Sequence, residues 1–202
     1  IEKHGLNGRY VYLPVNPANP EDLKAALKGL SVMGFAGCNL TLPHKVMALP
    51  MVDRSDATAK RMGAINTIVV EADGSLSGYN NDGYGYIQSL LVAKPDWQAD
   101  AGPTLIMGAG GAARAVVVSL AEQGAKDIRI CNRTDSSAVD LAAEFATDFA
   151  QNLGTKIAAV PWAQRHDAVA DVALLVNTTC QGMGSNPALD LNLAKLPKTA
   201  LV

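Results

Sequence analysis

The sequence predicts an α/β protein of two lobes, the second built on a doubly wound parallel sheet. From residue 104 onward, short apolar and β-branched runs alternate with helical patterns, which is typical of parallel strands joined by helices. A glycine-rich turn follows the first of these runs. Residues 94–103 are polar and contain proline, as connections between lobes often do. We therefore expect one lobe over residues 1–92 and another over residues 93–202, with a ligand in the cleft between them.

In the first lobe, residues 9–15 are β-branched and aromatic and predict a strand. Asn19 and Pro20, followed by two acids, predict the start of a helix that runs to Leu30. Residues 34–40 predict a second strand. A β-α-β opening favours a parallel pair of strands.

The rest of the first lobe reads as short elements. We expect a helix over residues 57–62, a strand over 65–70, a hairpin turn at 73–74 that returns to residue 79, and a helix from about 82 to 91.

The second lobe has the regular alternation. Strands are expected over residues 104–107, 127–131, 156–160 and 172–176, and helices over 111–123, near 136–150 and near 163–170. Such a sheet is covered on both faces.

Composition excludes several classes of protein. Of the 202 residues, 49% are hydrophobic and 18% are charged, and the formal net charge is -2. This balance gives no reason to expect nucleic acid or an acidic membrane surface as a partner. No apolar run approaches the roughly 20 residues of a membrane helix, and the first residues lack an apolar signal region. Three widely spaced cysteines in apolar surroundings (Cys38, Cys131 and Cys180) favour buried thiols over a disulfide or a metal site.

The glycine turn has a specific pattern. Gly108, Gly110 and Ala113 fit G-x-G-x-x-G/A between a strand and a helix, where this pattern indicates dinucleotide binding of the Rossmann type. Gly108 would permit the tight turn, Gly110 would let the backbone approach a pyrophosphate, and Ala113 would keep the helix close to its strand. The helix would point its free N–H groups and positive dipole end at the phosphates. A plain structural turn is the alternative.

Three polar clusters lie at turns or strand ends of the first lobe, in residues 39–45, 63–67 and 78–83. Binding residues are often placed on such loops. If the reaction is a hydride transfer at an alcohol or ketone, it also needs a proton donor or acceptor at the oxygen. A lysine beside a carboxylate can serve.

Six motifs, spread over nearly the whole chain, resemble the shikimate dehydrogenase family, which reduces 3-dehydroshikimate with NADPH. In chain order they are Asn39-x-Thr41-x-Pro43-x-Lys45, Gly63-Ala-x-Asn66-Thr67, Gly78-x-Asn80-x-Asp82, Gly108-Ala-Gly-Gly-Ala112, Asn132-Arg133-Thr134 and Asn177-x-Thr179-x-x-Gly182-Met183. The resemblance implies an N-terminal α/β substrate lobe plus a Rossmann-type cofactor domain. It also implies a cytoplasmic enzyme of aromatic-amino-acid biosynthesis.

Site roles follow from the resemblance, position by position. Lys45 and Asp82 would be the catalytic pair, with Lys45 supplying a proton to the oxygen as hydride passes from the nicotinamide to the ring ketone. Thr41 and Asn66 would hold the hydroxyls of shikimate or 3-dehydroshikimate. On residue type alone, Lys45 could be a surface charge and Asp82 a helix cap. His44 is expected to be a loop residue rather than a base.

The resemblance also implies where the cofactor binds: at the glycine turn, at the end of the second strand of the second lobe, and along the loop after the last strand. The expected binding residues are Gly108, Ala109, Gly110, Gly111, Ala112, Asn132, Arg133, Thr134, Thr178 and Met183. Met183 could instead fill a core.

The end of the second strand favours NADP over NAD. Asn132 stands where NAD sites usually carry an acid, and Arg133 can pair with a 2′-phosphate. Ser137 replaces a second basic residue of many NADP-dependent relatives, and Asp135 resembles the quinate/shikimate branch that can use NAD. NAD therefore stays possible, although Asp135 could also be only the N-cap of the next helix.

Two elements of the family are missing from this sequence. A serine-bearing loop that binds the substrate carboxylate would precede Ile1, and a late glutamine would follow Val202. We therefore expect both lobes to be incomplete, the first at its N-terminal and the second at its C-terminal end. Asn81 replaces the more usual threonine beside the catalytic aspartate. A quinate/shikimate dehydrogenase using NAD, or a non-catalytic ligand-binding homologue, remains the alternative, and the chain could be a monomer or a homodimer.

Overall fold

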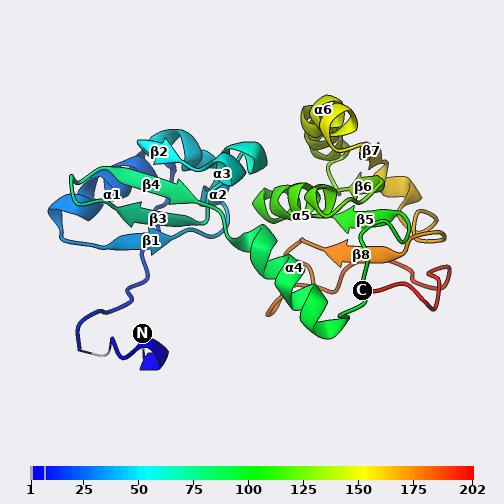
Figure 1. The fold of residues 1–202 in the computed structure, drawn as a ribbon, viewed down its shortest axis with the longest axis horizontal. Helices are drawn as coiled ribbons and strands as arrows, with labels where there is room; N and C mark the ends of the chain where they lie inside the picture. The colour runs from blue at the N-terminus through cyan, green and yellow to red at the C-terminus, as the bar shows by residue number, and fades with distance from the viewer. Residues whose placement is uncertain (1, 7) are drawn as a thin grey trace.

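Residues 2–6 and 8–202 are described by a computed structural model, in which two α/β lobes lie side by side (Figure 1). The first lobe is built on a mixed sheet in the order β1-β3-β4-β2. Its strands are β1 (Gly37–Asn39), β2 (Arg54–Ser55), β3 (Thr67–Val70) and β4 (Leu76–Tyr79). Its helices are η1 (Glu2–His4), α1 (Pro20–Val32), α2 (His44–Met47), η2 (Leu49–Met51) and α3 (Ala57–Met62).

Helix α1 begins as the sequence predicts. The side chain of Asn19 accepts a hydrogen bond from the backbone N–H of Asp22, and Pro20 occupies the first helical turn, where its missing N–H costs nothing. Leu23, Leu27 and Leu30 share the buried face of α1. They form the core of the first lobe with the buried side chains of the sheet, including those of Ile68 and Leu76.

Residues 9–15 do not form the predicted strand, so that prediction is wrong. The segment is largely exposed: Val11 keeps 79% and Tyr12 70% of its surface. Its residues suit a sheet, but a strand exists only where a neighbour pairs its N–H and C=O groups, and none of the described strands does so. The predicted parallel pair is also wrong, because β1 pairs antiparallel with β3, in the register Cys38↔Ile68.

The predicted hairpin is confirmed. Strands β3 and β4 pair antiparallel, and Gly74 adopts φ 82 in the turn. The carboxylate of Asp73 accepts hydrogen bonds from the N–H and the hydroxyl of Ser75, and Arg54 donates to its other oxygen. These bonds, those from Ser75 first, lower the pKa of Asp73 to about 2.

The second lobe confirms the predicted parallel sheet, with strand order β7-β6-β5-β8 and every pair parallel. Its strands are β5 (Thr104–Met107), β6 (Asp127–Cys131), β7 (Lys156–Val160) and β8 (Leu174–Asn177). Its helices are α5 (Gly111–Glu122), α6 (Asp135–Asn152) and η3 (Trp162–Gln164).

Both faces of this sheet are covered, but by different structures. Ile106 and Ile128 belong to a core shared with helices α5 and α6. On the opposite face, Leu105 and Met107 pack against residues from η3 and the chain beyond it. The helix expected near 163–170 is therefore wrong: η3 spans three residues and is followed by turns. Most of the backbone hydrogen bonds there join residues three apart, such as Ala170 N to Asp167 O.

Helix α4 (Asp82–Ala93) leaves the first lobe and runs under the second (Figure 1). Its side chain Ile87 is buried in the same core as α5. Residues 94–103 contain no helix or strand, as expected of a connection. The domain boundary at residues 92/93 stays a prediction. Helix α4 packs on the second lobe, although most of its residues precede that boundary.

Two further observations concern the chain end and the cysteines. Leu201 forms an isolated parallel bridge with Leu174, so the last residues do lie beside the sheet. All three cysteines are free, but only Cys131 is buried, and the prediction of a buried thiol is wrong for the exposed Cys180. Among the described residues, no helix has the length and apolar character needed to cross a bilayer.

Candidate active site

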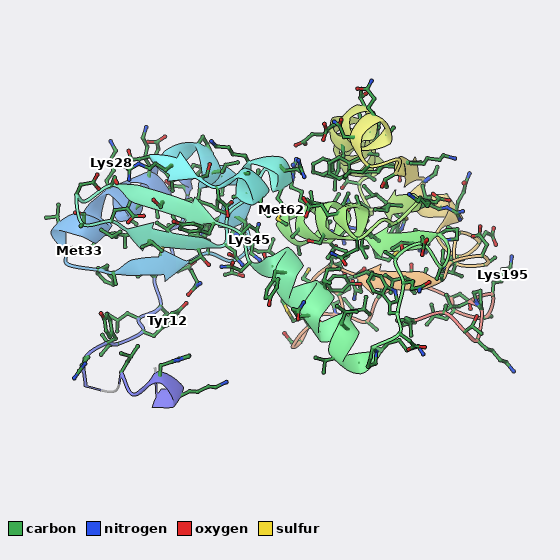
Figure 2. The ribbon with its side chains drawn as sticks, viewed as in Figure 1. Tyr12, Lys28, Met33, Lys45, Met62 and Lys195 are labelled. Atoms are coloured by element: carbon green, nitrogen blue, oxygen red, sulfur yellow. The ribbon has the colours of Figure 1, made fainter. Side chains whose placement is uncertain are left out.

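The structure brings Lys45 and Asp82 together, although 37 positions separate them in sequence. Lys45 lies on α2 and Asp82 is the first residue of α4. The Lys45 Nζ atom lies 2.7 Å from Asp82 Oδ2, and the two side chains keep 15% and 30% of their surface. Figure 2 shows Lys45 on the side of the first lobe that faces the second. The interpretation of Lys45 as an ordinary surface lysine is therefore wrong.

Asn66 holds the other oxygen of the aspartate. Its Nδ2 atom donates to Asp82 Oδ1 over 2.8 Å. Its own Oδ1 accepts from the Thr67 hydroxyl at 2.9 Å and from the Asn81 backbone N–H at 3.1 Å. Both carboxylate oxygens of Asp82 are thus bonded, which fixes the plane in which the carboxylate faces Lys45.

Hydrogen bonds of the backbone also hold together the segments that carry Lys45 and Asp82. The N–H of Ile65 donates to the carbonyl oxygen of Lys45 over 2.9 Å, so α2 is held beside the chain that carries Asn66. Asn80 is 5% exposed, accepts from the Asp82 N–H at 3.0 Å, and donates to the Ala64 carbonyl oxygen at 2.9 Å. Sequence reasoning placed Asn80 in a motif but gave it no role. Its burial and its two hydrogen bonds identify Asn80 as a residue that positions Asp82.

The alternative that Asp82 is only a helix cap is wrong. The N-cap of α4 is Asn81, whose side chain makes no capping bond. The Asp82 side chain is instead directed to Lys45 and Asn66. Because the N-terminal end of a helix carries a partial positive charge, the ionised Asp82 side chain in the first turn of α4 is also stabilised by the helix dipole.

Thr41 and His44 lie at one edge of the site. Thr41 is exposed, and its hydroxyl makes no hydrogen bond to a described residue. His44 is 8% exposed and begins α2, so its assignment as a loop residue is wrong. Its Nδ1 atom has no partner among residues 2–6 and 8–202. Both residues border an apolar cavity of about 170 Å³ within the first lobe.

The glycine turn has the geometry expected of a phosphate cradle. Gly108 adopts φ 115, and a Cβ there would lie 2.4 Å from Thr178 Oγ1, so a side chain is excluded. A Cβ on Gly110 would meet nothing within 4 Å, which means that the space above the turn is open. Ala113 is fully buried where α5 packs on the sheet. Ala109, Gly111 and Ala112 complete the turn and the first turn of α5.

The catalytic pair lies next to this turn. A Cβ on Gly111 would lie 3.1 Å from Lys45 Cβ, so the lysine stem rests against the start of α5. Arg114 of α5 donates to the Met62 carbonyl oxygen at 3.3 Å, and Arg61 pairs with Glu122 at 2.8 Å. These contacts fix α3 against α5. The Lys45–Asp82 pair therefore stands beside the N-terminal end of α5, the kind of helix end that suits a phosphate.

At the end of β6, the residues expected to contact the adenosine ribose lie near the surface. Asn132 donates to the Thr134 carbonyl oxygen at 3.0 Å, and Arg133 and Thr134 are exposed. The interpretation of Asp135 as an N-cap is wrong, because Thr134 occupies that position. The Asp135 carboxylate accepts instead from the Trp162 backbone N–H, over 2.7 Å.

The loop after β8 is held by its own side chains. Asn177 Oδ1 accepts from the N–H and the hydroxyl of Thr179. The Thr178 hydroxyl donates to the Met107 carbonyl oxygen at 2.8 Å, which holds the loop against the end of β5. Met183 is 62% exposed, so the alternative that it fills a core is wrong.

Neither Lys45 nor Asp82 lines one of the larger cavities, although Thr67 borders a cavity of about 680 Å³. One of about 670 Å³ is lined by Asp127, Arg129 and Lys156 at the edge of the second sheet. Arg129 there is bound to Asp127 and Asp171, and these bonds, that from Asp171 first, raise its pKa. Two of the charged groups that line this cavity, Asp127 and Arg129, are thus already paired with each other. Residues 2–6 and 8–202 contain no group of three or more His, Cys, Asp or Glu side chains placed to hold a metal ion.

A parallel sheet with a glycine turn at the carboxyl end of β5, joined to a second lobe that presents a lysine–aspartate pair, defines a two-lobed dinucleotide-binding dehydrogenase. Comparisons with known proteins narrow this class. The family model for the shikimate dehydrogenase substrate binding domain matches residues 1–68, and that for shikimate / quinate 5-dehydrogenase matches residues 93–174. The chain belongs to the shikimate dehydrogenase family.

Individual relatives agree. The chain is 44% identical over 202 residues to a shikimate dehydrogenase (NADP(+)) of Paramagnetospirillum magneticum and covers 69% of that protein. The structure matches that of a shikimate dehydrogenase from Aquifex aeolicus with a TM-score of 0.79 at 32% identity, covering 99% of this chain and 68% of the other. It also matches a quinate dehydrogenase from Corynebacterium glutamicum in complex with NAD, with a TM-score of 0.78 at 28% identity, covering 93% and 65%. The chain thus spans about two thirds of the length of these relatives.

Proposed function

We propose that this protein catalyses the reversible, NADP-dependent reduction of 3-dehydroshikimate to shikimate. The observation that carries the proposal is the Lys45–Asp82 ion pair at 2.7 Å, placed beside the glycine turn at the start of α5. The relative from Paramagnetospirillum magneticum carries the name of this NADP-dependent enzyme, which supports the same activity.

In this proposal Lys45 is the proton donor. Its ammonium group would give a proton to the substrate oxygen during reduction and its amine would take one back during oxidation. Asp82 would orient the lysine and stabilise its charged form, while Asn66 keeps the carboxylate in place. Thr41, whose hydroxyl makes no bond to a described residue, would be available to a substrate hydroxyl.

The residues of the second lobe fit a dinucleotide. The open space over Gly110 admits a pyrophosphate, and the N–H groups at the start of α5 would bind it. Arg133 and Thr134 would contact the 2′-phosphate and Asn132 the adenosine ribose. Thr178 and Met183 would lie beside the nicotinamide, with Gly108, Ala109, Gly111 and Ala112 shaping the turn. Bound NADPH supplies the hydride.

A quinate/shikimate dehydrogenase using NAD is the second candidate. The structural match to a quinate dehydrogenase in complex with NAD favours it, as does the acid at position 135. Retention of both Lys45 and Asp82 weighs against a non-catalytic homologue. We further propose a cytoplasmic location and small-molecule partners, for a monomer or a homodimer.

A four-way comparison of substrates and cofactors tests the proposal. In the full-length protein, kcat/KM would be measured for shikimate and for quinate, each with NADP⁺ and NAD⁺, by the absorbance of the reduced cofactor. We expect the highest value for shikimate with NADP⁺. Stronger turnover of quinate with NAD⁺ would reject this function in favour of the second candidate.

A further inference from the structure

The turns that follow β6 and β7 are joined by a hydrogen bond that no local pattern requires. The two strands are parallel neighbours in the register Cys131↔Val160, so the turns after them meet at one edge of the sheet. There the Asp135 carboxylate accepts from the Trp162 N–H over 2.7 Å. The bond links the turn at which an adenosine ribose would lie to the next turn of the sheet.

A buried thiol and a paired arginine lie near this hydrogen bond. Burial, then the Asp135 charge, raises the pKa of the Cys131 thiol to about 11, and the Arg165 guanidinium opposes the rise. Arg165 stacks on the Trp162 ring at 4.5 Å and pairs with Asp190. Asp135 is therefore close enough to the buried Cys131, at the end of β6, for its charge to be felt there.

Arg133, two residues earlier, differs from Asp135 in its bonding, although both residues are exposed. It is exposed, and its guanidinium makes no ion pair or hydrogen bond with any residue in the described parts of the chain. One turn thus carries an acid engaged by a backbone N–H and a cation that is free to bind a ligand. The two side chains favour different cofactors. A cation pairs with the 2′-phosphate of NADP, whereas an acid binds the ribose hydroxyls of NAD.

We propose that the Trp162 backbone N–H makes Asp135 a specificity-determining positioning residue, by holding its carboxylate away from the adenosine ribose and so favouring NADP over NAD. The inference rests on the proposed function and deepens it. A released carboxylate would accept hydrogen bonds from the ribose hydroxyls of NAD and would repel a 2′-phosphate. Charge-assisted bonds of this kind correspond to a change in preference of about 10- to 100-fold.

The N–H can be removed with a matched control. Trp162→Pro deletes both the N–H and the ring, whereas Trp162→Ala deletes only the ring. Proline suits position 162 for two reasons. Trp162 is the first residue of η3, where a proline is tolerated. The residue before a proline must be extended, and Pro161 already has φ -57 and ψ 138. Asp135→Asn, alone and combined with Trp162→Pro, completes the set.

The readout is binding, and needs no substrate. Dissociation constants for 2′,5′-ADP and for ADP would be measured by titration calorimetry on the full-length protein, and their ratio compared between variants. We expect Trp162→Pro to lower the preference for 2′,5′-ADP by about 10- to 100-fold relative to Trp162→Ala. Adding Asp135→Asn should restore it. Asp135→Asn alone should change the affinity for 2′,5′-ADP by less than about threefold, because the native carboxylate already faces away.

Two results would overturn the proposal. One is an equal preference in Trp162→Pro and Trp162→Ala. The other is a gain of more than about tenfold in 2′,5′-ADP affinity in Asp135→Asn, which would place the native carboxylate at the phosphate. The second result is decisive even where Trp162→Pro does not fold. Failure to turn over shikimate, with the binding ratios as expected, would reject the proposed function and leave this inference standing.

Discussion

Replacing Gly83 by alanine should destabilise the protein, although glycine inside a helix is normally unfavourable. Gly83 follows Asp82 in α4 and is buried against α5. A Cβ there would lie 1.9 Å from Ser119 Oγ, 2.8 Å from Met62 Cε and 3.0 Å from the Ala115 carbonyl oxygen. The first two atoms can move, but the backbone oxygen cannot, so α4 must shift away from α5.

The expected cost is that of overpacking a core, about 1–3 kcal/mol. For a chain of this size it corresponds to a fall in Tm of roughly 2–12 °C. Gly85, two residues along the same helix, is the matched control, because it is exposed and a Cβ there would meet nothing within 4 Å. Gly85→Ala should raise the free energy of unfolding by about 0.4–1 kcal/mol, because alanine lowers the conformational entropy of the unfolded chain. Glycine-to-alanine substitution is thus expected to lower stability at position 83 and to raise it at position 85.

Scanning calorimetry of both variants measures this difference, and kcat/KM tests its link to function. Because Gly83 adjoins Asp82, a shift of α4 should also lower kcat/KM in Gly83→Ala and leave it unchanged in Gly85→Ala. Adding Ser119→Ala, which removes the nearest atom, should recover part of the lost Tm. Equal stability of Gly83→Ala and the parent would refute the close packing of α4 on α5.

Three further predictions concern the cofactor turn, the acid range and the contact between lobes. Gly110→Ala should keep the parental Tm but weaken NADPH binding measured by fluorescence titration, whereas Gly108→Ala should lower the Tm as well, because its φ is 115 and its Cβ would meet Thr178. Asp73→Asn should lower the Tm above about pH 4 and progressively lose this effect as the pH falls through about 2, because the folded pKa is about 2 and lies below the ordinary 3.8; a Tm difference as large at pH 2 as at pH 5 would contradict it. Arg114→Ala should cost about 1–2 kcal/mol of stability by urea unfolding, since it loses bonds to α3 and α6, and Arg133→Ala, which lacks such bonds, should cost nothing measurable.

Local patterns predicted the parts of the molecule that local chemistry determines. The glycine turn was found because a tight turn and a close phosphate require small residues at fixed spacing, and the positive φ of Gly108 agrees. The start of α1 was found because Asn19 and Pro20 satisfy the first turn of a helix by themselves. The side chains of Lys45 and Asp82 were identified by resemblance, and their distance came only from the structure.

Contacts between distant segments could not be predicted. Residues 9–15 have the composition of a strand, but composition does not say whether a partner strand is available. The role of Asn80 depends on its burial between Ala64 and Asp82, and that of Asp135 on the register of β6 and β7. The docking of α4 on α5 depends on a buried glycine whose partner residue is more than 30 positions away.

The central claim is that Lys45 and Asp82 act as one unit in proton transfer. A double-mutant cycle of Lys45→Met and Asp82→Asn, read as kcat/KM for the oxidation of shikimate with NADP⁺ in the full-length protein, tests it most directly. Each single variant should lose about 10²- to 10⁴-fold, and the double variant should lose little more than the worse single one. A single variant within tenfold of the parent, or losses that multiply in the double variant, would contradict it.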